Sequence, residues 1–174
     1  PIKVMDKEGS GTSFDVANGI IWATDHGAEI INLSLGNYQP AAVIEEAIQH
    51  AFDNDVILVA ATGNDSTDQP GYPAAYPQVI SVAAVDQNGE WAEFSNFGDY
   101  VNVTAPGVAI ASTYPGKAYA EMSGTSMAAP HVTALAALIR SSYPELSNTQ
   151  VMHIINRTTT DLGEPGYDGY YGNG

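Results

Sequence analysis

The residue best placed to do chemistry is Ser126, which lies where a flexible turn leads into a long apolar run. Gly124 allows tight backbone geometry before it, and Pro130 is tolerated in the first turn of a helix, so we predict a helix that begins near Ser126. The run is apolar on every side, which is typical of a buried helix. The Ser126 hydroxyl would then lie beside free backbone N–H groups at the positive end of the helix dipole. This setting suits a nucleophile whose reaction creates an oxyanion.

A serine in this place is most often an ordinary helix N-cap. The surrounding sequence favours catalysis, because Gly124–Val132 reads Gly-Thr-Ser-Met-Ala-Ala-Pro-His-Val. This stretch resembles the active-serine signature of the subtilisin-like serine peptidases, the subtilase family. The resemblance implies that Ser126 is the nucleophile and that the chemistry needs no cofactor. It also implies an α/β fold of three layers with a mostly parallel sheet, truncated here at both ends.

The same resemblance suggests an oxyanion hole and a peptide-binding cleft. Asn64 is similar to the family's side-chain oxyanion donor, and the N–H of Ser126 would be the second donor, although asparagine is also a common turn residue. Two segments resemble those that bracket an extended peptide: Gly9, Ser10 and Gly11, and Ser34, Leu35 and Gly36. The pocket for the side chain before the cleaved bond would be formed by Ala61, Thr62, Gly63 and Gly71. Taken singly, each glycine would be an ordinary loop residue. Similar proteins also have a cis peptide at the position of Tyr72-Pro73.

A serine nucleophile also needs a histidine base and a carboxylate that orients it. The family's aspartate and histidine motifs do not occur in this sequence, and each of the four histidines has another interpretation. His26 ends a predicted helix and can interact with its dipole. His131 follows Ser126 by five residues on one helix, so we predict a buried structural role. His50 and His153 lie on other predicted helices.

We therefore interpret residues 1–174 as a single partial peptidase domain whose aspartate and histidine precede Pro1. The parent would be a secreted serine endopeptidase that cleaves extended peptides, and the chain alone is expected to be inactive. The alternative is an inactive scaffold that binds peptides or a partner protein. A nucleotide-binding function is poorly supported, because the glycine-rich stretch at 9–13 lacks the lysine of a P-loop.

Composition excludes several other classes of function. The 20 acidic residues against 5 basic ones give a formal net charge of -15, which disfavours binding to nucleic acid or to an anionic membrane. No run of apolar residues is long enough to span a bilayer. The chain has no cysteine, so it has neither disulfides nor thiol chemistry. No metal ligand is predicted, because no spacing matches a calcium loop, although the family resemblance allows structural calcium in the parent.

Alternating strands and helices predict a parallel sheet with right-handed crossovers. Strands are expected at residues 2–5, 29–35, 56–61, 79–85, 100–104, 108–112 and 118–122. Helices are expected at 14–26, with Ser13 or Thr12 as its cap, at 40–53, from about 126, and at 148–157. Catalytic groups gather beyond the carboxyl ends of parallel strands. The segments that end in Gly36 and Asn64 would therefore meet near Ser126.

Overall fold

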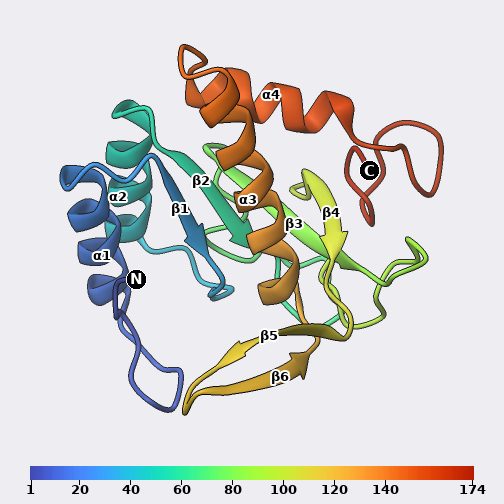
Figure 1. Ribbon diagram of the computed structural model, residues 1–174, viewed down its shortest axis with the longest axis horizontal. Coiled ribbons are helices and arrows are strands. Elements are labelled where there is room, and N and C mark those ends of the chain that lie inside the picture. The colour runs from blue at the N-terminus through green and yellow to red at the C-terminus, as the bar shows by residue number, and fades with distance from the viewer.

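The computed structural model describes residues 1–174 and has a four-stranded parallel sheet at its centre (Figure 1). Its strands are β1 (Ile30–Leu33), β2 (Ile57–Ala61), β3 (Val79–Val85) and β4 (Val103–Pro106), and they lie in the order β1-β2-β3-β4. Every residue of β2 and β3 is buried, because these strands occupy the middle of a sheet that is covered on both faces. This position explains why β2 is apolar throughout and why β3 is apolar except for Ser81, whose buried hydroxyl donates to Asn102.

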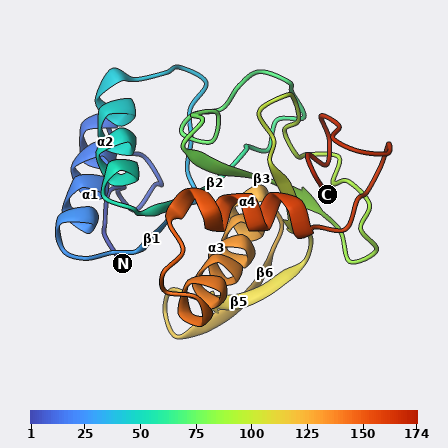
Figure 2. The same cartoon turned by 90° about the horizontal axis from the view of Figure 1, so that it is seen from above.

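Helices cover both faces of the sheet (Figure 2). Helices α1 (Ser13–Asp25) and α2 (Ala42–Asp53) pack side by side on one face, over a core that includes Ile20, Ile48 and Leu58. Helices α3 (Thr125–Ser142) and α4 (Asn148–Thr158) lie on the other face, over a second core around Val59, Val82 and Ala128. The two cores and the sheet between them make three layers, so the predicted three-layer α/β architecture is confirmed.

Local sequence explains where two of these helices begin. Thr12 caps α1, and the Asp15 side chain accepts the Thr12 N–H in return, which forms a capping box. Ser147 and Gln150 form the same arrangement at the start of α4. Most predicted bounds hold within three residues. The predicted strand at 2–5 is wrong, because this segment packs against Gly19 of α1 through Val4 and has no neighbouring strand.

Helix α3 corrects the prediction of a helix buried all round. Its small residues, such as Ala128 and Ala136, face the sheet and are fully buried. On its other side Leu135 is 43% exposed and Leu138 is 67% exposed. His131 is also exposed, so its predicted burial is wrong. The physical reason is that the sheet covers one side of α3 and no element of this chain covers the other.

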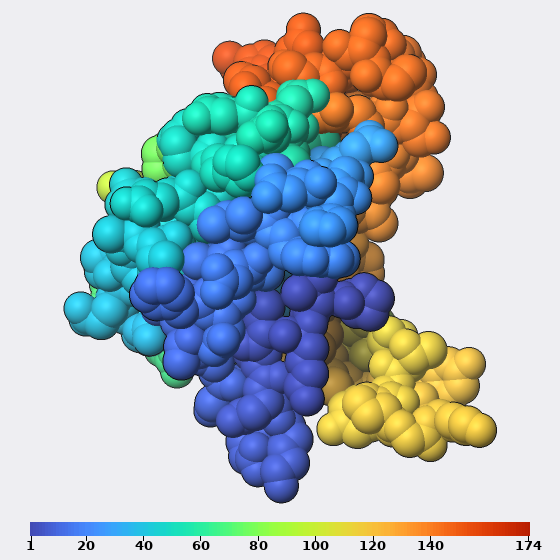
Figure 3. Space-filling view, turned by 90° about the vertical axis from the view of Figure 1, so that its left-hand side faces the viewer, coloured from blue at the N-terminus to red at the C-terminus, as the bar shows by residue number.

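A hairpin projects from the body of the molecule near the start of α3. Strands β5 (Ile110–Tyr114) and β6 (Ala118–Met122) form a separate antiparallel sheet. Figure 3 shows the hairpin standing away from the body, near the N-terminal loop. Tyr119 of β6, which is paired with Thr113 of β5, is 82% exposed.

An ion pair joins the two sides of the sheet. Asp55, in the turn between α2 and β2, accepts a hydrogen bond of 2.9 Å from Nη1 of Arg140 on α3. Its backbone carbonyl accepts a second bond from Nη2 at 3.2 Å, and its other carboxylate oxygen accepts the N–H of Asn148 at the start of α4 at 2.6 Å. The Arg140 side chain is only 11% exposed. These contacts fix the α2–β2 turn to both α3 and α4.

We expect Arg140→Met to lower the free energy of unfolding by about 1–3 kcal/mol, because it leaves Oδ2 and the backbone carbonyl of Asp55 without their donor. Half of the Asp55 side chain is exposed, so the loss should be smaller than for a fully buried pair. The control is Lys7→Met, which removes a surface pair with Glu8 and should cost less than about 0.5 kcal/mol. Urea denaturation measures both. Equal effects of the two substitutions would contradict the structural role given to Arg140.

Candidate active site

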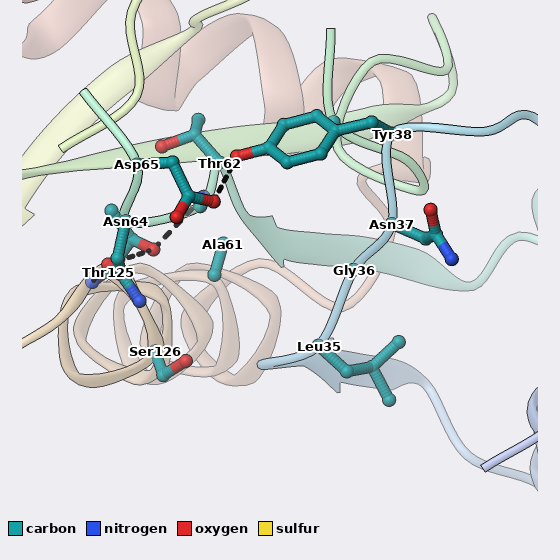
Figure 4. Close-up of a pocket in the computed structure, with 12 residues that line it drawn as sticks. Leu35, Gly36, Asn37, Tyr38, Ala61, Thr62, Asn64, Asp65, Thr125 and Ser126 are labelled. Atoms are coloured by element: carbon teal, nitrogen blue, oxygen red, sulfur yellow. Dashed lines mark hydrogen bonds between the residues drawn. The ribbon is translucent and has the colours of Figure 1, made fainter. Parts of the chain in front are cut away.

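A cavity of about 280 Å³ lies where the carboxyl ends of β1 and β2 face the start of α3 (Figure 4). Among the residues proposed from the sequence, those that line it are Leu35, Gly36, Ala61, Thr62, Gly63, Asn64, Gly71 and Ser126. Four lining residues were not proposed, namely Asn37, Tyr38, Asp65 and Thr125. The structure therefore brings together three segments that are far apart in the sequence, together with the serine of the signature.

Ser126 is not the N-cap of α3. The cap is Gly124, whose φ of 155° favours glycine, and no side chain caps this end of the helix. The Ser126 hydroxyl is therefore not needed to cap the helix, and its only hydrogen bond in the chain is a long one of 3.5 Å to the backbone carbonyl of Ser34. The N–H groups of the first turn have no carbonyl four residues before them within the helix. The N–H groups of Met127 and Ala128 donate to the carbonyl of Gly124, whereas the N–H of Ser126 makes no hydrogen bond and is a free donor beside the half-buried Ser126 side chain.

Pro130 lies in the second turn of α3, not in the first as the sequence suggested, because the helix begins at Thr125. Proline has no N–H, so the Ser126 carbonyl loses the donor that would normally come from four residues ahead. The Ser34 hydroxyl replaces it and donates to this carbonyl at 2.9 Å. Asn32 donates in turn to the Ser34 hydroxyl, also at 2.9 Å. The end of β1 is thereby attached to the serine that the signature singles out.

Asn64 is held by the residue before the serine. Its Oδ1 accepts hydrogen bonds from the Thr125 N–H at 2.8 Å and from the Thr125 hydroxyl at 3.0 Å. The same hydroxyl accepts the N–H of Gly63 at 3.1 Å. Because Oδ1 is engaged, the amide is fixed with Nδ2 available as a donor beside Ser126. Thr125 belongs to the Gly124–Val132 signature, but nothing in the sequence indicates that it contacts Asn64.

Glycines let the walls of the cavity approach one another. A Cβ at Gly71 would lie 2.8 Å from the carbonyl oxygen of Thr62, and one at Gly63 would lie 2.3 Å from Nδ2 of Asn96. Gly63 also has a φ of 113°. The loop that carries Gly71 has the expected cis peptide at Tyr72-Pro73. Any larger side chain at either glycine would push the walls apart.

The segment Gly9–Gly11 does not line this cavity. It belongs to a turn in which Asp6 accepts the N–H of Ser10 at 2.9 Å, and it borders a separate hollow near residues 3–6. Ser34 does not line the cavity either, although it contacts Ser126. The proposed roles of these residues in binding an extended peptide stay predictions.

None of the histidines lines the cavity. His131 bonds the carbonyl of Met127 within its own helix at 2.9 Å, and His26 bonds the carbonyl of Trp22 in the same way at 2.7 Å. His50 makes a hydrogen bond of 2.9 Å to Asp25 between α2 and α1. The cavity therefore holds a serine and the amide of Asn64, but no histidine.

Comparison with known proteins identifies the family. The sequence model described as "Subtilase family" matches residues 1–174. The chain belongs to the subtilase family. A thermostable alkaline protease of Halalkalibacterium halodurans is 46% identical over 173 residues, covering 99% of this chain and 47% of that protein. Subtilisin DY of Bacillus licheniformis is 45% identical over 177 residues, covering 99% of this chain and 64% of that protein.

Solved structures agree with this assignment. The structure titled "Sphericase" superposes with a TM-score of 0.91 at 36% identity, and covers 99% of this subtilase chain and 66% of its own. A psychrophilic protease, S41, gives a TM-score of 0.89 at 35% identity over the same shares. The chain thus spans about half to two thirds of the length of these relatives.

Tyr100, which lies beside the cavity wall, should make the folding stability of this subtilase chain fall at alkaline pH. Burial raises the pKa of Tyr100 from 10.0 to about 12, and its hydroxyl lies 3.5 Å from the Thr62 carbonyl. The folded chain keeps the phenol neutral, whereas the unfolded chain ionises it near pH 10. This contribution to stability is complete below pH 10 and is lost progressively as the pH rises from 10 to about 12.

We expect Tyr100→Phe to make the unfolding free energy fall less steeply between pH 10 and 12, by about 1–2 kcal/mol over that range. Denaturation by urea at half-unit pH steps measures the slope. Tyr119→Phe is the control, since that exposed ring on the hairpin should leave the slope unchanged. Parallel curves for the wild-type chain and Tyr100→Phe would contradict the assignment.

Proposed function

We propose that this chain is the nucleophile-bearing part of a serine endopeptidase that acts outside the cell. The observation that carries the proposal is the juxtaposition of Ser126 with the fixed amide of Asn64 at one cavity. The Ser126 hydroxyl attacks the peptide carbonyl and forms a tetrahedral oxyanion. The Ser126 N–H and Asn64 Nδ2 donate to that oxygen. Departure of the amine leaves an acyl-enzyme on Ser126, which water hydrolyses.

The proton of Ser126 must be taken by a histidine that an aspartate orients. We propose that a further segment of the parent protein supplies both groups, since no histidine of this chain reaches the cavity. Apolar surface supports this idea. The edge strand β1 borders an apolar groove of about 320 Å³ beside α1, and Leu135 and Leu138 of α3 are exposed. A strand and loop of the parent would cover these surfaces.

Substrates would be extended peptides or proteins, bracketed by Gly9–Gly11 on one side and Ser34–Gly36 on the other. The chain's charge of -15 opposes binding to nucleic acid, and none of its helices has the length and apolarity needed to cross a membrane. The proposed chemistry uses no cofactor. Structural calcium is proposed only for the parent, because no group of three or more acidic or histidine side chains here is arranged to hold a metal.

An alternative function is a scaffold that binds peptides without cleaving them. The absence of a base from the cavity favours it. Turnover of a fluorogenic peptide by the parent protein, compared with this chain alone, separates the two functions. The protease proposal expects turnover by the parent and at most trace turnover by the chain. A parent that binds the peptide but never cleaves it would overturn the proposal in favour of the scaffold.

A further inference from the structure

A row of hydrogen-bonded side chains joins the middle of α3 to the serine near its start. The Thr133 hydroxyl donates to Oδ1 of Asn32 at 2.8 Å. Nδ2 of Asn32 donates to the Ser34 hydroxyl at 2.9 Å, and that hydroxyl donates to the backbone carbonyl of Ser126 at 2.9 Å. We call Thr133, Asn32 and Ser34 the relay. None of these three residues lines the cavity shown in Figure 4.

Each hydrogen bond of the relay can run in only one direction. A backbone carbonyl accepts hydrogen bonds and cannot donate them, so the single proton of the Ser34 hydroxyl goes to Ser126. Ser34 must then accept from Asn32, which turns Nδ2 towards Ser34 and Oδ1 towards Thr133. Because Oδ1 is an acceptor only, the proton of that last contact comes from Thr133. The orientation of the Asn32 amide is therefore fixed from both ends of the relay.

Two sequence periods bring these residues together. Asn32 and Ser34 are two residues apart at the end of β1, and side chains at this spacing on an extended backbone lie on the same face of a sheet. Thr133 follows Ser126 by seven residues, which is about two turns of α3, so both lie on one side of the helix. The relay thus attaches the edge strand β1 to α3 at two levels of the helix.

The relay restricts the position of the nucleophile. Pro130 leaves the Ser126 carbonyl without its usual helical donor, and the Ser34 hydroxyl takes that place. The backbone carbonyl of Ser34 also accepts the Ser126 hydroxyl over 3.5 Å. Ser34 therefore contacts Ser126 both at its carbonyl and at its reacting oxygen. A misplacement of about 1 Å in an active site can cost a factor of about 10² in rate, so the position of Ser34 matters for catalysis.

Thr133 is the best-fixed member of the relay. The side chains of Asn32 and Ser34 are exposed, so water competes for their hydrogen bonds, whereas Thr133 is half-buried within a helix of 18 residues. Its branched side chain also has few rotamers to choose from. Without the Thr133 hydroxyl, nothing in this chain would hold Oδ1 of Asn32, and the donor to Ser34 would be free to rotate.

We propose that Thr133 is a positioning residue that acts on Ser126 through Asn32 and Ser34. This inference rests on the proposed function of Ser126. Thr133 makes no hydrogen bond to Ser126 itself, and its effect is on the rate of attack, because that rate depends on where the Ser126 hydroxyl stands. The alternative is that Thr133 only stabilises the packing of α3 on β1.

The test compares two substitutions at Thr133 in the intact protease. Thr133→Val has nearly the same shape but no hydroxyl, whereas Thr133→Ser keeps the hydroxyl. We expect Thr133→Val to lower kcat about 3–10-fold and to leave KM within about twofold of the wild-type value, because the substrate surface is untouched. Thr133→Ser should keep kcat within about twofold. Turnover of a fluorogenic peptide gives both constants, and circular dichroism checks the fold.

A double-mutant cycle with Asn32→Ala tests the path from Thr133 to Ser126. Asn32→Ala should lower kcat to a similar extent, and adding Thr133→Val should cause no further loss, because the connection is already broken.

Thr158→Val is the matched control. The Thr158 hydroxyl donates only within its own helix, to the carbonyl of Ile154 at 2.9 Å, and the Thr133 hydroxyl lies within 3.1 Å of the Ala129 carbonyl in the same way. Removing this kind of contact alone should leave kcat unchanged.

Three results would overturn the inference while the proposed function stands: a wild-type kcat in Thr133→Val, a Thr133→Ser variant as slow as Thr133→Val, or an undiminished effect of Thr133→Val in the Asn32→Ala background. If the intact protease cleaves no peptide, the proposed function fails instead. The carbon NMR shift of the Ser126 carbonyl then decides the inference, since loss of the Ser34 hydrogen bond changes it. A shift that Thr133→Val leaves unaltered would overturn the inference, and a change that Thr133→Ser reverses would support it.

Discussion

Replacing Ser126 by alanine is expected to abolish peptide cleavage by the intact protease. The loss in kcat should be about 10⁶-fold, which is the size of effect that removal of the serine has in a subtilisin. The reason is structural as well as chemical. The side chain is not used as a helix cap, so the substitution removes the nucleophile and leaves α3 and its Gly124 cap in place. Turnover of a fluorogenic peptide gives the rate, and circular dichroism checks the fold.

Ser141→Ala supplies the control, because Ser141 lies on the exposed last turn of the same helix. Its rate should match that of the wild-type protein within about twofold. Activity that persists in Ser126→Ala would mean that another group attacks the peptide, and the proposed mechanism would be wrong.

Replacing Asn64 by alanine should lower kcat about 10²–10³-fold and change KM much less, because the donor acts on an oxyanion that exists only in the transition state. The magnitude is that of the corresponding donor in a subtilisin. Asn64→Asp, which keeps the shape but replaces the donor by a negative charge, should be at least as damaging. The kinetic constants of the purified variants measure both effects.

Asn88→Ala is the comparison for Asn64, since Asn88 lies in an exposed turn outside the cavity. Its kcat should stay within about twofold of the wild-type value. An Asn64→Ala variant that raises KM and keeps kcat would show that Asn64 binds substrate in the ground state instead of stabilising the oxyanion.

The sequence predicted the fold well because its strongest signals are local. The apolar run of β2, the run of β3 that only Ser81 interrupts, and Thr12 as one of two candidate caps of α1 are such signals. Prediction failed where the outcome depends on neighbours. The apolar run of α3 indicates burial on all sides, but burial needs a second covering element, and this chain supplies one only on the side of the sheet. The strand predicted at residues 2–5 is wrong for the same reason, since a strand requires a neighbouring strand to pair with.

The candidate site also has one part that local sequence predicted and another that depends on tertiary packing. The signature identified Ser126, and the segments that end in Gly36 and Asn64 reached the same cavity because parallel strands deliver their carboxyl ends to one edge. The hydrogen bonds from Thr125 to Asn64 and from Tyr38 to Asp65 could not be predicted from the sequence. Each joins residues that only tertiary packing brings together.

The central claim is that Ser126 is a nucleophile that another part of the parent must activate. Fluorophosphonate labelling of the folded 174-residue chain, alone and in the intact parent, followed by peptide mapping, tests it most directly. We predict stoichiometric labelling at Ser126 in the parent and none in the chain alone. Equal labelling of the folded chain would show that its own residues supply the base, and a parent that stays unlabelled would contradict the assignment of Ser126 as the nucleophile.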